Sequence, residues 1–184
     1  MKITGIILLS ILIFSSCIRN SYEDKTQFHS FLKKLRKIET PVSFNSNDDY
    51  QIKLQYLRDD PFFMKIDSLY GGYGIFGILF ETEDFVAILG NIPTATGTPI
   101  ITTFDSKGNK IETHSIYENV IGDIGIFSSN FETIYPDMTI SFIDSTKTLK
   151  LNEDGSDIIP GTDSLSVKKL KYKINNNGKF LRIE

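Results

Sequence analysis

Cys17 is the only cysteine of the chain, and its position is the clearest indication of chemistry in the sequence. A short positive start, an apolar run over residues 3–14 and two serines precede it in that order. This order of segments is typical of an export signal, which is removed before the mature protein folds. As a helix, the run would be about 18 Å long, too short for a hydrocarbon core of roughly 30 Å. We therefore expect residues 1–16 to be a signal peptide.

Phe14-Ser15-Ser16-Cys17 resembles the lipobox of bacterial lipoprotein signal peptides, in which two small residues precede a cysteine. The resemblance implies cleavage before Cys17, a diacylglycerol on its thiol, and acylation of its new amino group. The bilayer is then the first partner. Ile18 is not the aspartate that some bacteria use for inner-membrane retention, which favours the outer membrane, facing the periplasm or the cell surface. The alternative is a secreted protein with a chance cysteine, although a free thiol is a liability in oxidising compartments.

The composition of the mature chain limits its size and its partners. Residues 17–23 form a short lipidated tether, and residues 24–184 are enough for one ordinary domain. The net charge of −3 argues against a nucleic-acid partner, which requires a basic footprint. With Cys17 lipidated, neither a disulfide nor a cysteine metal site is possible, so the fold depends on its hydrophobic core.

Two short motifs have spacings found at ligand sites. Gly72-Tyr73-Gly74-Ile75-Phe76-Gly77 has the spacing of the dinucleotide fingerprint, but it leads into a predicted strand where that motif requires a helix. We interpret it as a glycine-softened strand or bulge that another backbone or an aromatic ring approaches closely. Asn152-Glu153-Asp154-Gly155-Ser156-Asp157 is as oxygen-rich as a calcium loop, yet Lys150 stands where the first carboxylate belongs. A hairpin turn explains it better, so we predict no cofactor and no metal site.

Histidines and adjacent acids are the remaining candidates for catalysis. His29 falls on a predicted helix, off its apolar side, and His114 falls in a polar strand stretch; isolated histidines are more often surface residues than metal ligands. No nucleophile elbow or second cysteine supports a triad. Three acid pairs have the residue type for acid–base chemistry, but adjacent acids in loops are usually solvated: Asp48-Asp49, Asp59-Asp60 and Glu83-Asp84. We predict no catalytic residue and no enzymatic activity.

Aromatic residues gather between residues 60 and 73, around a predicted turn and a glycine cluster. Exposed, they would form a binding patch for a sugar, a peptide or a protein loop. Because Phe is usually buried, we expect them in the core. They are Phe62, Phe63, Tyr70 and Tyr73.

An amphipathic helix is predicted over residues 24–39 and ends at Thr40-Pro41. Its apolar residues recur at helical spacing on one face: Phe28, Phe31, Leu32, Leu35 and Ile38. This face packs on the core, which we favour, or lies on an anionic bilayer beside the anchor.

Alternating residues predict strands over most of the remaining chain: residues 50–56, 73–80, 85–89, 99–104, 110–117, 131–135, 138–143, 167–174 and 179–183. Three turns, at residues 105–108, 152–155 and 175–178, place Asp or Asn first and Gly last, where a positive φ is needed. The predicted fold is mainly β, a single antiparallel sandwich or rolled-sheet domain with one N-terminal helix.

Hairpins around Thr103-Phe104-Asp105-x-x-Gly108 and Tyr172-Lys173-Ile174-Asn175-x-x-Gly178 make the layout similar to small lipoproteins of uncharacterised function from Gram-negative bacteria. That resemblance implies no active site. We therefore predict a non-catalytic binding or structural module of the cell envelope, with an envelope protein or glycan as its further partner. The alternative is an envelope inhibitor, for example of a lysozyme or a toxin, which should project a loop with a few anchor residues.

Overall fold

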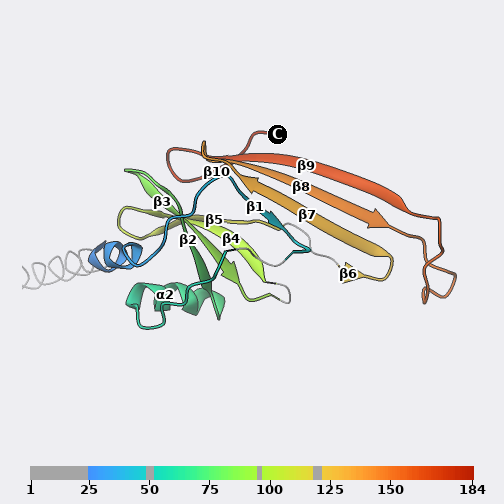
Figure 1. Cartoon of the computed structure of the whole chain (residues 1–184), viewed down its shortest axis with the longest axis horizontal. Helices are drawn as coiled ribbons and strands as arrows, with labels where there is room; N and C mark the ends of the chain where they lie inside the picture. The colour runs from blue at the N-terminus through green and yellow to red at the C-terminus, as the bar shows by residue number, and fades with distance from the viewer. Residues whose placement is uncertain (1–24, 49–51, 95–96, 118–121) are drawn as a thin grey trace, which may run out of the picture.

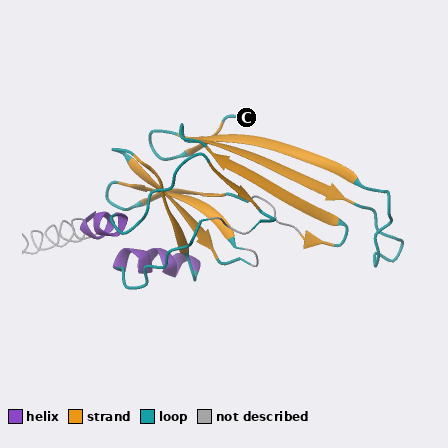
Figure 2. Cartoon of the chain, in the orientation of Figure 1, coloured by secondary structure: helices purple, strands orange, loops and turns teal. Residues whose placement is uncertain are grey.

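The computed structural model describes residues 25–48, 52–94, 97–117 and 122–184 (Figure 1). In these residues the chain is mainly β, with two antiparallel sheets and two helices, and this confirms the predicted fold class (Figure 2). The N-terminal helix occupies residues 25–32, and the second helix, α2, spans Pro61–Tyr70. The strands are β1 (Val42–Asn45), β2 (Gly74–Glu81), β3 (Phe85–Ile92), β4 (Thr98–Asp105), β5 (Lys110–Ser115), β6 (Gly122–Asp123), β7 (Ile126–Ile134), β8 (Thr139–Thr148), β9 (Ser164–Ile174) and β10 (Phe180–Arg182).

The two sheets have simple connectivity. The four-stranded sheet is a meander in the order β2-β3-β4-β5. The six-stranded sheet has the order β1-β7-β8-β9-β10, with the short β6 also paired to β7. Every pairing between named strands is antiparallel. The two longest pairings of the six-stranded sheet are those of β7 with β8 and of β8 with β9.

The four-stranded sheet is covered on both faces, which makes three layers. One apolar cluster joins the helices to this sheet and includes Phe28, Phe31, Phe62 and Phe63; another fills the space between the two sheets and includes Phe76. β2 is accordingly buried from its first residue to its seventh. A strand with both faces covered is apolar throughout and loses the alternation of a half-exposed strand.

The N-terminal helix is shorter than predicted. Phe28, Phe31, Leu32 and Leu35 are all buried in the core, as the favoured prediction requires, so this face is not available to a bilayer. The helix nevertheless ends at residue 32, well before the proline. The helix ends early because the backbone of residues 36–38 pairs in parallel with β2. In this pairing the amide of Ile78 donates to the Arg36 carbonyl at 2.9 Å.

The turn predicted among the aromatic residues near residue 60 is wrong, because the helix α2 lies there. Asp60 caps the helix, Pro61 is its first residue, and Gly71 ends it with φ 67°. These are ordinary start and stop signals of a helix. The predicted burial is confirmed for Phe62, Phe63 and Tyr73, which are almost fully buried, whereas Tyr70 is only partly buried.

The prediction of a strand over residues 50–56 is also wrong for residues 52–56, the part of it that the structure describes. Only Gln55 pairs there, in an isolated bridge to Ile75, and residues 49–51 lie outside the described residues. The side chain of Leu54 lies against Gly74 of β2, so this segment is held as a loop over the sheet. Two short strands, β1 and β6, were not predicted.

The three predicted turns are confirmed. Gly108, Gly155 and Gly178 have φ of 85°, 72° and 74°. In the first turn, Asp105 accepts hydrogen bonds from the backbone amides of Lys107 and Asn109, at 2.8 and 2.9 Å. Asn175 holds the last turn in the same way.

Part of the six-stranded sheet continues past the other layers as an arm, formed by β6, the adjoining parts of β7, β8 and β9, and the loop of residues 149–163 (Figure 1). The arm and the N-terminal helix lie at opposite ends of the long axis of the molecule (Figure 1).

Candidate functional site

Cys17 lies outside the described residues, as do Asp24 and Asp49. Among the described residues, no helix has the length and the hydropathy that a membrane span requires. The anchor therefore stays a prediction from the sequence.

The glycine motif is a strand, as interpreted. Residues 74–77 belong to β2, and a Cβ placed on Gly77 would lie 2.5 Å from the carbonyl oxygen of Arg36. The missing side chain allows residues 36–38 to pair with the strand, and Arg36 adds a hydrogen bond from Nε to the Phe76 carbonyl at 2.8 Å. This close backbone approach explains the glycine, and no phosphate-binding turn is formed.

The oxygen-rich loop is a closed turn. Oδ1 of Asn152 accepts a hydrogen bond from the amide of Asp157, and Oδ1 of Asp154 accepts from both the amide and the hydroxyl of Ser156. These bonds hold the pKa of Asp154 below its usual value, with the Ser156 hydroxyl as the main cause. Within the described ranges, no group of three or more His, Cys, Asp or Glu side chains is placed to hold a metal ion.

The two histidines have different surroundings. His29 is exposed on the N-terminal helix, whereas His114 on β5 is enclosed between the sheets, with 15% of its side chain accessible. Its ring stacks on Phe180 with centroids 5.0 Å apart, and its Nε2 lies 4.0 Å from a carboxylate oxygen of the buried Glu132. The expectation of a surface histidine is wrong for His114, because β5 turns this side chain toward the six-stranded sheet.

The acid pairs are not brought together. Asp59, Glu83 and Asp84 are exposed, whereas Asp60 is buried beneath Lys34 at the start of α2. Asp48 is exposed as well, so the expectation of solvated acids is confirmed for these residues and wrong for Asp60.

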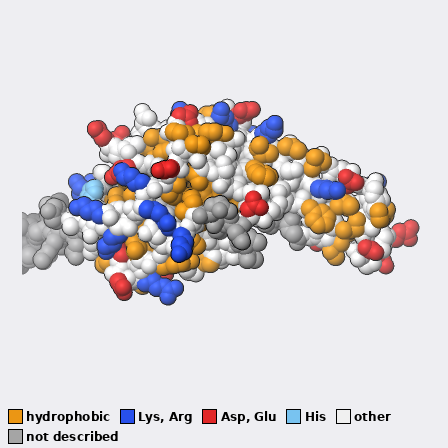
Figure 3. All heavy atoms as spheres, viewed as in Figure 1, with side chains coloured by type: hydrophobic (Ala, Val, Ile, Leu, Met, Phe, Trp, Pro, Cys, Tyr) orange, Lys and Arg blue, Asp and Glu red, His pale blue; other side chains and the backbone are white. Residues whose placement is uncertain are grey.

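The feature that sequence reasoning missed is the outer face of the six-stranded sheet, the face that points away from the four-stranded sheet. β7 buries Asn130, Glu132 and Ile134 and turns the alternate residues outward, among them Phe131 with 47% of its surface exposed. The outward apolar residues of β7, β8 and β9 are Phe127, Phe131, Ile143, Leu165 and Val167. Hydrophobic side chains are also visible on the arm in the space-filling view (Figure 3).

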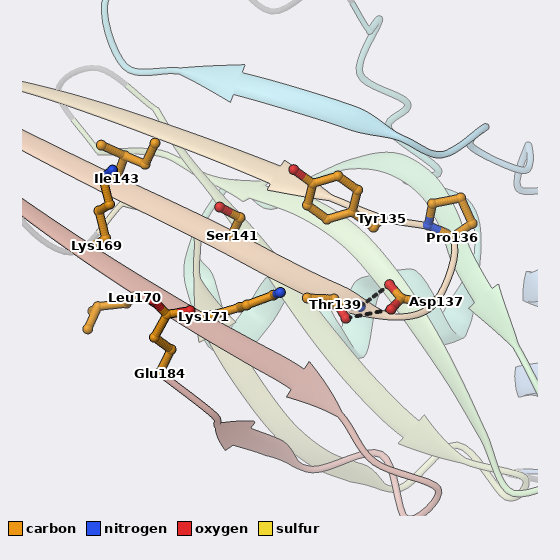
Figure 4. A pocket seen from close by; sticks show the side chains of 10 residues that line it. All are labelled: Tyr135, Pro136, Asp137, Thr139, Ser141, Ile143, Lys169, Leu170, Lys171 and Glu184. Carbon is orange, nitrogen blue, oxygen red and sulfur yellow. Dashed lines mark hydrogen bonds between the residues drawn. The ribbon is translucent and has the colours of Figure 1, made fainter.

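A groove of about 620 Å³ lies on this outer face, between the β7–β8 turn and the end of the chain. Tyr135 and Asp137 lie at one end, and the side chain of Lys171 extends toward Thr139 (Figure 4). The hydroxyl and then the amide of Thr139 hydrogen-bond to Asp137 and hold the pKa of that carboxyl below its usual range. The groove thus combines the ring of Tyr135 with side chains of both charges, Asp137 and Glu184 on one hand and Lys169 and Lys171 on the other.

Comparison of the chain with protein-family models, with curated proteins and with solved structures finds no match in any of the three. The function is therefore argued from the residues and their geometry.

Proposed function

We propose that this chain is a lipid-anchored, non-catalytic binding module of the bacterial cell envelope. The acylated Cys17 holds it to the membrane, most favourably the outer membrane, and the outer face of the six-stranded sheet binds an envelope partner. The observation that carries the proposal is the set of exposed apolar side chains on that face. On this face Phe131 lies opposite Ile143, and Leu165 and Val167 are neighbours on β9; exposed apolar groups that lie together mark surfaces that another molecule covers.

The charge distribution supports the same orientation. Lys25, Lys33 and Lys37 are exposed on or just after the N-terminal helix, which is the described segment closest in sequence to Cys17. Basic side chains gather at the end of the molecule where the N-terminal helix lies (Figure 3). Each lysine close to an anionic leaflet contributes roughly 1 kcal/mol of attraction. This end therefore faces the bilayer, and the arm points away from it.

Site-specific photo-cross-linking in cells tests the binding face. A photoreactive amino acid at Phe131, which is 47% exposed, samples the outer face, and the same group at Leu69, which is 65% exposed, samples a more accessible position on α2. We expect one discrete cross-linked product from position 131 and none from position 69. Equal products from both positions, or none from position 131, would contradict the proposal.

Metabolic labelling with a fatty-acid probe tests the anchor. We expect the wild-type chain to be labelled and to fractionate with membranes, and the Cys17→Ala chain to lose both properties. Ser21→Ala, which keeps the thiol, is the matched control and should behave as wild type. Labelling of the Cys17→Ala chain would show that the anchor is assigned wrongly.

One observation supports the inhibitor as a second candidate. The loop of residues 149–163 forms the tip of the arm, is tied by the Leu151–Ile158 bridge, and exposes Leu151 and Ile159. It also carries the acids Glu153, Asp154, Asp157 and Asp163, which complement a basic target. Inhibition of an envelope-polymer hydrolase that is lost in Leu151→Ser and retained in Phe131→Ser would favour this function over the sheet-face module.

A further inference from the structure

β9 is paired along one side only for most of its length. Ten of its eleven residues pair with β8, from Thr139 opposite Lys173 to Thr148 opposite Ser164. On its other side, β10 pairs with residues 172–174 alone. The last described residues extend this contact by one position, so that residues 164–170 form a long edge.

The hydrogen bonds at Lys171 show which groups face this edge. Its carbonyl accepts from the Ile183 amide at 2.7 Å, and its amide donates to the Glu184 carbonyl at 3.3 Å. Hydrogen-bonding groups alternate along an antiparallel strand. The amides and carbonyls of Leu165, Val167 and Lys169 therefore point the same way, and among the described residues no backbone group lies opposite them.

The side chains of this edge protect it against some strands and leave it open to others. Lysine on an edge is one of the usual devices that blunt it, beside proline, a bulge or a cover. Here residues 164–169 are all exposed, residues 164–167 carry no charge and no proline, and the outward side chains include Leu165 and Val167, exposed by 68% and 50%. An exposed, unpaired edge is a template for strand addition by a segment that complements its side chains.

The charge of β9 selects the kind of strand. The strand contains four lysines and no acid: Lys168, Lys169, Lys171 and Lys173. A second copy of β9 would bring a second set of lysines to the same edge, and like charges across a strand pair are destabilising. An acidic strand is attracted instead, and apolar residues opposite Leu165 and Val167 would extend the outer apolar face.

We propose that residues 165–169 of β9 bind an extended peptide segment of a partner protein by antiparallel strand addition. The segment carries acidic residues opposite Lys168 and Lys169, followed by alternating apolar residues opposite Val167 and Leu165. This inference rests on the proposed binding function and names the class of partner.

The test uses the full chain in mild detergent and the labelled synthetic peptide Thr-Glu-Glu-Val-Thr-Val-Thr, with binding followed by fluorescence anisotropy. Val167→Pro removes an outward amide and should weaken binding of the peptide by about tenfold or more, which corresponds to the loss of one or two hydrogen bonds. Val167→Thr keeps the amide and should bind within about threefold of wild type. Lys169→Glu should weaken the binding of this acidic peptide and strengthen the binding of a peptide in which lysines replace the two glutamates.

Hydrogen exchange gives a readout on the unmutated chain in case Val167→Pro does not fold. The peptide should slow exchange of the amides of Leu165, Val167 and Lys169 and leave those of α2 unchanged. Absence of binding, binding without this protection, equal affinity for a peptide with proline at both valines, or self-association through β9 would each overturn the proposal. If the peptide fails while Phe131 still yields its cross-link, strand addition is wrong and the proposed function stands; if both fail, both are wrong.

Discussion

At the scale of single residues, the carboxylate of Asp60 connects the start of α2 to Lys34, which follows the N-terminal helix. Its Oδ1 accepts hydrogen bonds from the amides of Phe62 and Phe63, at 2.9 and 3.0 Å, and its Oδ2 accepts from Nζ of Lys34 at 2.6 Å. Burial acts to raise the pKa of Asp60, but the Lys34 ammonium and the two amides together hold it below its ordinary value of 3.8. The charged form is therefore stabilised in the folded protein.

Asp60→Ala should lower the free energy of unfolding by about 1–2 kcal/mol, the usual cost of losing an N-cap. Because the folded pKa is depressed, this contribution is complete above pH 3.8 and is lost as the pH falls through the folded pKa. Urea denaturation between pH 7 and pH 2 measures both effects. Asp59→Ala, at the exposed neighbour, should change neither the stability nor its pH profile by more than about 0.5 kcal/mol.

Gly77→Ala should destabilise the protein by about 1–3 kcal/mol, since the new Cβ would lie 2.5 Å from the Arg36 carbonyl and the strand backbone cannot yield freely. Gly155→Ala is the matched control, because its Cβ would meet nothing within 4 Å and only its positive φ is disfavoured, at about 1 kcal/mol. Thermal melting compares the two. A larger loss at Gly155 would show that the pairing of residues 36–38 with β2 contributes little.

At the scale of elements, local sequence signals predict most of the strands. They do not predict which face of a strand is buried or where a helix ends. β2 and β4 follow from short runs rich in apolar and β-branched residues between turn residues, and the glycine turns follow from turn chemistry. The N-terminal helix stops early because β2 recruits residues 36–38, a tertiary effect that periodicity does not contain. α2 had its cap residues in the sequence, but Pro61 and Gly71 at its ends suggested a turn. β7 inverts the expected pattern, since the fold buries Glu132 and exposes Phe131.

The inversion of β7 leads to opposite expectations for two neighbouring aromatic residues. Phe131→Ser should leave the free energy of unfolding within about 0.5 kcal/mol, because its side chain is half exposed on the outer face. Phe142→Ala, on the buried face of β8, should cost about 3–5 kcal/mol. Denaturant unfolding of both variants measures this. Comparable losses would mean that Phe131 is covered within the folded chain and is not free for a partner.

At the scale of the whole molecule, the N-terminal helix and the arm, which carries part of the outer face, occupy opposite ends (Figure 1). Of the candidate site, the sequence allowed the anchor to be predicted, because Cys17 is recognised from local order. The outer face could not be predicted, because exposure of Phe131, Leu165 and Val167 depends on which side of the sheet meets the core. That choice is made by packing against the four-stranded sheet and is not encoded in any local spacing.

This arrangement predicts a fixed orientation on the membrane. A chain of the length from Cys17 to Lys25 spans at most about 30 Å even when fully extended. With Cys17 acylated, as proposed, the N-terminal helix would therefore stay close to the bilayer. In vesicles containing nitroxide lipids, a fluorophore at Ser30→Cys on this helix should be quenched, and the same fluorophore at Ser156→Cys, at the tip of the arm, should not. The engineered thiols can be labelled selectively, because the only native cysteine is the predicted acylation site. Equal quenching at both positions would mean that the arm lies along the membrane, and the long edge of β9 would then be presented to lipid instead of to a protein partner.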